Sequence, residues 1–248
     1  MHRINIRSII LDIDGTLTED RNTERLSLEA IAAIREALDT RIDIEIGLAT
    51  GNSHIVAMSL ARYIGLDFSR CPIISENGCL LWYRGKLYDI CADYEEDIEK
   101  SREIIQKEAI GKIVRESYQN EYRRRDFAYY PLPGIDPYYA INFIKNLLDK
   151  YGLNCLDVRY SGYAIHVIPR TVNKGTAVKL YSEISGIPTE HIVAIGDSDT
   201  DIELLSSVGL PVAVANATEG LKNVAKIVLS RPSGEGVAEF FRKFVLYS

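Results

Sequence analysis

The sequence predicts an α/β fold, in which a doubly wound, Rossmann-like parallel sheet carries an inserted α+β cap domain. Three observations support this fold class. Short apolar runs alternate with amphipathic segments over residues 1–82, and the same alternation returns over residues 169–248. Between them, residues 83–168 contain hairpin-like strands and separate helices. We therefore expect a core built from the two outer segments and a cap built from the middle one.

The first half of the core has a β-α-β-α-β pattern. The run IRSIILDID (residues 6–14) is continuous and apolar, as is typical of a strand that is buried on both faces. Ser27 is placed to cap the first helix, and Gly65 to end the second. The elements that follow the first strand are expected over residues 26–40 (helix), 42–50 (strand), 53–65 (helix) and 71–75 (strand). This order predicts parallel strands joined by helices.

The middle segment has a different character. A hairpin is expected to turn at residues 84–86, and a charged amphipathic helix to cover residues 95–108. The tyrosine-rich stretch over residues 129–139 contains prolines and a glycine, which predicts irregular structure. A helix near residues 138–150 and strands over residues 155–161 and 163–169 complete the cap.

The second half of the core resumes the alternation of helices and strands. Three helices are expected, over residues 174–186, 199–209 and 236–247. Three strands are expected, over residues 191–197, 211–216 and 226–230. The whole pattern is that of one doubly wound sheet interrupted by the cap.

The composition limits the classes of function. Of 248 residues, 46% are hydrophobic and 26% charged, and the net charge of −6 argues against binding to nucleic acid. No apolar run has the roughly 18–20 residues of a membrane helix, and no signal peptide is evident. The four cysteines lack the close spacing of a zinc site or a redox pair, so we expect reduced, structural thiols in a cytoplasmic protein.

Four polar clusters follow expected strands or begin an expected helix. In an open parallel sheet, ligands bind beyond the carboxyl ends of the strands. Each cluster alone has an ordinary explanation, such as a solvated turn, a helix cap, a surface lysine or an acidic first turn. Their coincidence at one edge of the sheet is the functional signal. The clusters are Asp12 with Asp14, Thr50-Gly51-Asn52, Lys174, and Asp197 with Asp201.

These side chains together predict phosphoryl transfer. Converging carboxylates repel one another and need a hard cation such as Mg²⁺. A phosphate monoester adds negative charge, which a lysine and hydroxyl or amide donors can balance. One carboxylate can attack phosphorus, and a second can protonate the leaving alkoxide and later deprotonate the hydrolytic water.

The segments DIDGTLT, ATGN, NKGT and GDSDTD, in this order, resemble the four motifs of the haloacid dehalogenase superfamily of phosphatases. The insert over residues 83–168, between the second and third motifs, resembles the C2-type cap of its Cof-like branch. The resemblance implies that Asp12 is the nucleophile and Asp14 the general acid/base. It implies that Thr50, Gly51, Asn52 and Lys174 bind the phosphoryl group, and that Gly15 forms the turn that directs both aspartates inward. Mg²⁺ would be held by Asp12, the main-chain carbonyl of Asp14, Asp197 and, directly or through another ligand, Asp201. Many relatives have Asn-Asp where this chain has Thr200-Asp201.

The short cap and the segment SGYAIHVIPRTVNKGT are similar to archaeal phosphoglycolate phosphatases, which implies the hydrolysis of 2-phosphoglycolate to glycolate. The alternative substrate is a phosphosugar or a range of small phosphorylated metabolites. An aspartyl-phosphate signalling receiver is an alternative from another class, but a receiver needs no cap and lacks an acid two residues after the acceptor. A catalytically inactive scaffold is a further alternative, which the complete set of catalytic residue types disfavours.

The cap is expected to select the leaving group. Arg123, Arg124 and Arg125 could bind a substrate carboxylate, but a solvated charge run is the preferred interpretation. His166 lies in an apolar strand, where a structural role is favoured over substrate contact. Six tyrosines are expected to pack the cap core or a homodimer interface rather than bind a cofactor; they are Tyr118, Tyr122, Tyr129, Tyr130, Tyr138 and Tyr139.

Overall fold

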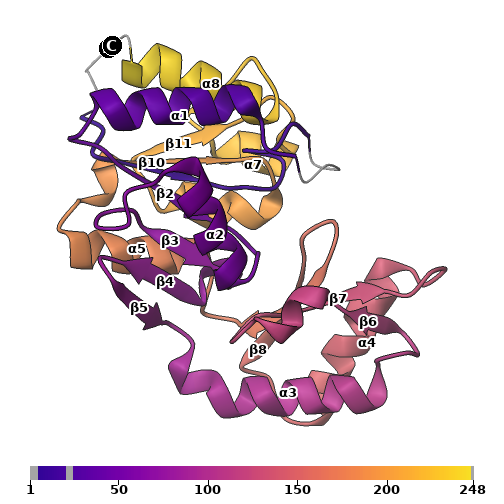
Figure 1. Cartoon of the computed structure of the whole chain (residues 1–248). Coiled ribbons are helices and arrows are strands. Elements are labelled where there is room, and N and C mark those ends of the chain that lie inside the picture. Colours follow the sequence, from indigo (N-terminus) through magenta and orange to yellow (C-terminus); the bar gives the residue numbers. More distant parts are fainter. Residues whose placement is uncertain (1–4, 21–24, 247–248) are drawn as a thin grey trace.

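The computed structural model describes residues 5–20 and 25–246. It contains two sheets, one in the core and one in the cap (Figure 1). The larger sheet has eight strands and the smaller has four. Each sheet belongs to its own cluster of buried apolar side chains. The predicted α/β class with an inserted α+β cap is therefore confirmed.

The large sheet has the strand order β12-β11-β10-β1-β2-β3-β4-β5. Its strands are parallel from β12 to β3, and β4 and β5 form an antiparallel hairpin at the edge. All residues of β1, β2 and β10 are buried, as expected for strands covered on both faces. The strand bounds are β1 Ser8–Leu11, β2 Glu45–Ala49, β3 Ile73–Ser75, β4 Leu80–Tyr83, β5 Lys86–Asp89, β10 Ile192–Gly196, β11 Leu210–Ala213 and β12 Ile227–Val228.

Six helices connect and cover these strands. They are α1 Leu28–Thr40, α2 His54–Ile64, α5 Lys174–Ser185, α6 Ile202–Ser206, α7 Glu219–Val224 and α8 Ser233–Phe241. Helix α1 lies beside α8, and α6 contacts both α5 and α7 (Figure 1). Ser27 caps α1 by accepting a hydrogen bond from the Ala30 amide, and Gly65 ends α2 in the left-handed conformation. Both predicted helix signals are confirmed.

The cap pairs its four antiparallel strands in the order β6-β7-β9-β8. Its elements are α3 Glu95–Glu108, β6 Val114–Glu116, β7 Phe127–Pro131, α4 Pro137–Lys150, β8 Leu156–Tyr160 and β9 Ile165–Pro169. Figure 1 shows α3 and α4 on the side of the cap that faces away from the core. The predicted domain boundary at residue 83 lies within the β4–β5 hairpin, whose second strand also pairs in the large sheet. The division at residues 82/83 and 168/169 stays a prediction.

The expectation of irregular structure at the start of the tyrosine-rich stretch is wrong. Tyr129, Tyr130 and Pro131 lie in β7, which pairs with β6 on one side and β9 on the other. Aromatic residues favour strands, but the nearby prolines and Gly134 concealed this signal. The short strand β6 was not anticipated either. Within residues 5–20 and 25–246, no helix combines the length and apolarity needed to cross a bilayer.

Candidate active site

Three neighbouring strands of the large sheet deliver the predicted polar residues to one edge. Asp12 follows β1, Thr50 follows β2 and Asp197 follows β10. Since β1 pairs in parallel with both β2 and β10, the carboxyl ends of all three strands meet. Lys174, the first residue of α5, reaches the same place from the segment that returns from the cap.

Lys174 joins two of the predicted acids. Its Nζ lies 2.6 Å from Oδ1 of Asp12 and 2.6 Å from Oδ1 of Asp201, and all three side chains are buried. The other oxygen of Asp201 accepts hydrogen bonds from the main-chain amides of Asp197 and Ser198, at 3.3 and 3.2 Å. Asp201 therefore positions both the lysine and the loop that follows β10.

Asp12, Asp197 and Asp201 form a group that can hold a cation. Each offers a carboxylate oxygen, these oxygens lie within 4.8 Å of one another, and all three residues are buried. Oxygen donors in a buried anionic group suit a hard divalent ion such as Mg²⁺. The side chain of Asp14 lies outside this group and is exposed, so that only its main-chain carbonyl, as predicted, is a candidate ligand.

The charges of this group explain why a cation is needed. Burial raises the pKa of Asp12 well above its ordinary range, and Asp201 raises it further, whereas Lys174 opposes the shift. Burial lowers the pKa of Lys174, but Asp12 and Asp201 outweigh that effect and the net pKa is raised. The lysine is thus charged, yet it alone cannot compensate the surrounding carboxylates. A divalent cation would restore the balance and keep Asp12 ionised.

Asp14 is connected to the loop after β2. Nδ2 of Asn52 donates to Oδ2 of Asp14 at 2.7 Å and also lies 3.1 Å from Oγ1 of Thr50. The amide of Asn52 donates to the same hydroxyl at 3.0 Å. Asp12 is buried and Asp14 exposed, so the two aspartates of the D-x-D pair occupy different environments. Gly51 stands between Thr50 and Asn52, and all three lie where the sequence predicted them.

Gly15 is required for two reasons. Its φ is +87°, a conformation that favours glycine. A Cβ at this position would also collide with the carboxylate of Asp197. The glycine therefore permits the close approach of the first and fourth motifs as well as the predicted turn.

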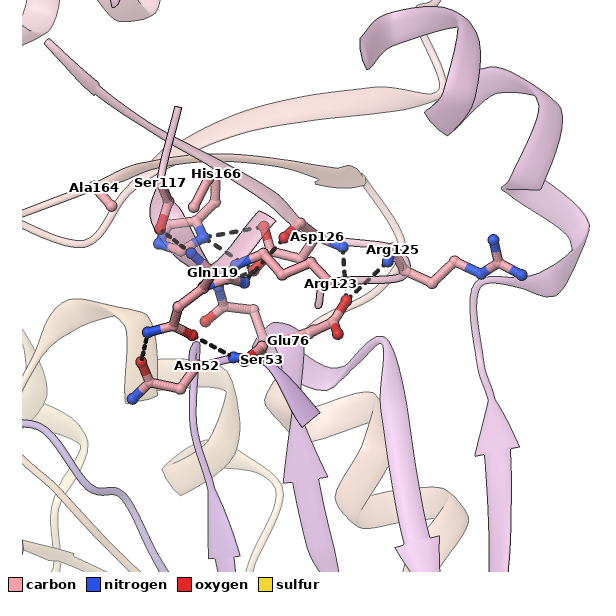
Figure 2. A network of polar contacts seen from close by, with 12 residues as sticks. Asn52, Ser53, Glu76, Ser117, Gln119, Arg123, Arg125, Asp126, Ala164 and His166 are labelled. Carbon is pink, nitrogen blue, oxygen red and sulfur yellow. Dashed lines mark hydrogen bonds and ion pairs between the residues drawn. The ribbon is translucent and has the colours of Figure 1, made fainter. Parts of the chain in front are cut away.

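The cap contacts the core through a residue that sequence reasoning missed. Oε1 of Gln119 accepts a hydrogen bond from the Ser53 amide, and Nε2 of Gln119 donates to Oδ1 of Asn52, both at 2.8 Å (Figure 2). Asn52 in turn binds Asp14, so one cap side chain is two contacts away from that carboxylate. No sequence pattern marks Gln119, because its partners lie 66 and 67 residues away.

A second contact between core and cap begins at the turn after β3. Glu76 and Asn77 have φ values of +52° and +54°, which are uncommon outside glycine. The Glu76 carboxylate accepts hydrogen bonds from the main-chain amides of residues 124–126 (Figure 2). Nδ2 of Asn77 donates to Oδ2 of Asp126 at 2.8 Å. The available signal was the sequence ENG directly after an expected strand, at the edge where the other motifs gather.

The interpretation of Arg123–Arg125 as a solvated charge run is wrong for its first member. Arg123 is 8% exposed and lines the pocket between cap and core, whereas Arg124 is exposed. Arg125 forms ion pairs with Asp89 and Glu95. The three side chains of this run thus have different surroundings, which composition could not show.

His166 is buried, as a structural histidine should be, but it also lines the pocket. Its Nδ1 lies 2.9 Å from Oδ2 of Asp126, and Nη1 of Arg123 lies 3.2 Å from the same oxygen. Burial raises the pKa of Asp126, but His166 and Arg123 outweigh it and the net pKa is lowered. We call Arg123, Asp126 and His166 the cap cluster.

The prediction for the six cap tyrosines holds only in part. Tyr129 is buried in the cap core, whereas Tyr118, Tyr122, Tyr138 and Tyr139 are exposed. Tyr118 and Tyr130 line the pocket, which was not anticipated. A homodimer interface stays a prediction. Cys71, Cys79, Cys91 and Cys155 are free thiols, as expected.

The pocket has a volume of about 280 Å³ and is lined by residues of both the core and the cap. Asp12, Asp14, Gly51, Asn52 and Lys174 contribute from the core. The cap contributes Arg123, His166 and Gln119 together with tyrosine, serine, alanine and glycine residues. A pocket of this size suits a small ligand, which would contact the carboxylate group at one end and the cap at the other.

Comparison with known proteins agrees with this geometry. The family model of haloacid dehalogenase-like hydrolases matches residues 9–130 and 134–241. A protein of Saccharolobus solfataricus named phosphoglycolate phosphatase 1 is 37% identical over 240 residues, which cover 97% of this chain and 96% of that protein. A phosphoglycolate phosphatase of Pyrobaculum aerophilum is 39% identical over 231 residues, 93% of this chain and 92% of that protein.

Two solved structures have the same overall fold. A crystal structure from Thermoplasma acidophilum superimposes with a TM-score of 0.80 at 26% identity, and the match covers 97% of this chain and 99% of the other. The sucrose-phosphatase of Synechocystis, solved with sucrose and phosphate, gives a TM-score of 0.75 at 20% identity over 98% and 99% of the chains. The second likeness concerns the fold alone.

Proposed function

The chain belongs to the haloacid dehalogenase-like hydrolase family, and we propose that it hydrolyses 2-phosphoglycolate to glycolate and phosphate. The enzyme is a phosphatase of that family, as its relatives are. One observation carries the proposal for the chemistry. It is the convergence of Lys174 with the carboxylates of Asp12 and Asp201 at 2.6 Å, beside Asp197 and below a pocket for a small ligand.

In the proposed first step, a carboxylate oxygen of Asp12 attacks phosphorus while the bond from phosphorus to the glycolate oxygen breaks. Asp14, held by Asn52 at 2.7 Å, gives its proton to the departing alkoxide. In the second step, Asp14 takes a proton from a water molecule that attacks the phosphorus of the aspartyl-phosphate. Phosphate leaves, and Asp12 is regenerated as a carboxylate.

Other residues balance charge during these steps. Lys174 is close enough to Asp12 to attract the phosphoryl oxygens, and the Thr50 hydroxyl and the main-chain amide of Gly51 are further donors in the loop that precedes α2. Asp12, Asp197, Asp201 and the main-chain carbonyl of Asp14 would hold Mg²⁺. The ion would supply positive charge where the phosphoryl oxygens gather.

The substrate assignment rests on two observations. Relatives at 37% and 39% identity over almost the whole chain are named phosphoglycolate phosphatases. The pocket volume of about 280 Å³ is at the small end of ligand sites, which suits a small phosphorylated metabolite. A phosphosugar or broad-specificity phosphatase of the same family is the alternative.

The experiment is a phosphate-release assay on the purified protein with Mg²⁺. 2-Phosphoglycolate, hexose phosphates, phosphoserine and p-nitrophenyl phosphate are compared by kcat/KM. We expect 2-phosphoglycolate to be preferred and a chelator to abolish turnover. Asp12→Asn, checked for folding by circular dichroism, should lose activity on every substrate. Full turnover by this variant would overturn the nucleophile assignment, and preference for a hexose phosphate would overturn the substrate assignment alone.

A further inference from the structure

We propose that the cap cluster is a carboxylate-binding subsite, in which Arg123 binds the substrate carboxylate and Asp126 and His166 hold Arg123 and the pocket wall in place. The proposal deepens the proposed function and depends on it, because it assumes that the phosphoryl group occupies the opposite, core end of the same pocket. It makes Arg123 the residue that distinguishes a phosphorylated acid from a neutral phosphate ester.

The hydrogen bonds of Arg123 leave one edge of its guanidinium unused. Nη1 donates to the main-chain oxygen of Asp126 at 2.9 Å and to its carboxylate at 3.2 Å. Nε is buried and has no hydrogen-bond partner, and Nη2 makes no hydrogen bond with any described residue. Nε and Nη2 are the parallel donors with which arginine binds a carboxylate in a bidentate manner. A donor edge without a partner, on a side chain that is only 3% exposed, indicates that a ligand completes it.

The position of Arg123 is fixed by its surroundings. The Asp126 carboxylate accepts hydrogen bonds from Arg123 and from Nδ1 of His166 (Figure 2). It also accepts one from Nδ2 of Asn77, and it is fully buried. A ligand that meets Arg123 therefore meets an arginine that is already ordered, which reduces the entropy lost on binding. Because Asn77 belongs to the core, the same contacts hold the subsite at a set place above the core site.

The charges around the pocket favour an anion at its cap end. Among the described residues that line the pocket, the acidic ones are Asp12 and Asp14, and both belong to the core. Arg123 and His166 line the cap end, and Asp126 lies behind them. The nearby Glu76 carboxylate is occupied by three main-chain amides and does not line the pocket. A carboxylate on the Nε and Nη2 edge of Arg123 would thus face donors, while the Asp126 carboxylate is held by Nη1 of Arg123, His166 and Asn77.

The test compares two inhibitors of p-nitrophenyl phosphate hydrolysis by the Mg²⁺-loaded enzyme. 3-Phosphonopropionate copies 2-phosphoglycolate with a methylene in place of the ester oxygen, and propylphosphonate is the same molecule with a methyl group in place of the carboxylate. We expect 3-phosphonopropionate to bind about 100-fold more tightly to the wild type, as a desolvated arginine–carboxylate contact should allow. In Arg123→Gln the ratio of the two inhibition constants should fall close to one.

Arg124→Gln is the matched control, since it removes an exposed arginine of the same run and should keep the wild-type ratio. If Arg123→Gln does not fold, Arg123→Lys carries the test. It keeps a positive charge beside Asp126 but loses the two-donor edge, so the ratio should fall at least about tenfold. An unchanged ratio in the folded Arg123 variant, or no preference in the wild type, overturns the subsite.

The two proposals fail in distinguishable ways. If the inhibitor ratio depends on Arg123 but 2-phosphoglycolate is a poor substrate, the subsite stands and another phosphorylated acid is the substrate. If 2-phosphoglycolate is hydrolysed efficiently but the ratio does not depend on Arg123, the proposed function stands and the carboxylate is recognised elsewhere.

Discussion

Gly15→Ala is expected to damage both the stability of the core and its capacity to bind a cation. The left-handed φ of +87° costs an alanine roughly 1–2 kcal/mol. The new Cβ would also overlap the Asp197 carboxylate, and such overpacking costs about 1–3 kcal/mol. The sum of about 2–5 kcal/mol corresponds to a fall in melting temperature of roughly 4–20 °C for a chain of this size. Asp197 would have to move, so that the affinity for Mg²⁺ should fall as well.

Gly65→Ala is the matched control for this prediction. Gly65 has a similar φ of +96°, but a Cβ there would meet nothing within 4 Å. The control therefore shares the backbone strain and lacks the collision. Both variants are compared with the wild type by thermal unfolding, with chelator and with excess Mg²⁺, since a bound ion raises the melting temperature. If Gly15→Ala has the same melting temperature as Gly65→Ala and shows the full rise in melting temperature with Mg²⁺, the assigned role of Gly15 is wrong.

Two further variants test the contacts between cap and core. Gln119→Leu leaves the Ser53 amide without its partner and should cost about 1–3 kcal/mol of unfolding free energy, measured by urea denaturation. Gln119→Leu should also lower kcat, because Asn52 loses the contact that orients it toward Asp14. The control is Gln106→Leu, at an exposed position on α3, which should change neither the unfolding free energy nor kcat. Asp126→Asn should destabilise the protein above about pH 4, because the pKa of Asp126 is lowered in the folded state from its ordinary 3.8. The difference in unfolding free energy from the wild type should shrink as pH falls through that lowered pKa, whereas a difference that does not vary with pH would contradict the ion-pair account.

The core and its acids could be predicted from the sequence because their signals are local. A continuous apolar run identified β1, the segments IDIEIGLAT and HIVAIGD identified β2 and β10, and helical spacing with a capping serine identified α1. Since parallel strands present their carboxyl ends at one edge, the residues that follow them had to gather there. Lys174 begins a helix expected to face the same edge, so its place near Asp12, 162 residues away in the chain, could be predicted, but its direct contact with Asp12 could not.

The cap end of the pocket was decided by tertiary structure alone. Arg123 and Arg124 are neighbours of identical type, yet the fold buries one and exposes the other. The partners of Asp126 come from 3, 40 and 49 residues away and follow no periodicity. Local sequence determines which face of a strand or helix is apolar, but it does not determine which distant polar groups will meet. Which distant polar groups meet depends on how the separately packed core and cap fit together. The choice of leaving group depends on the same fit.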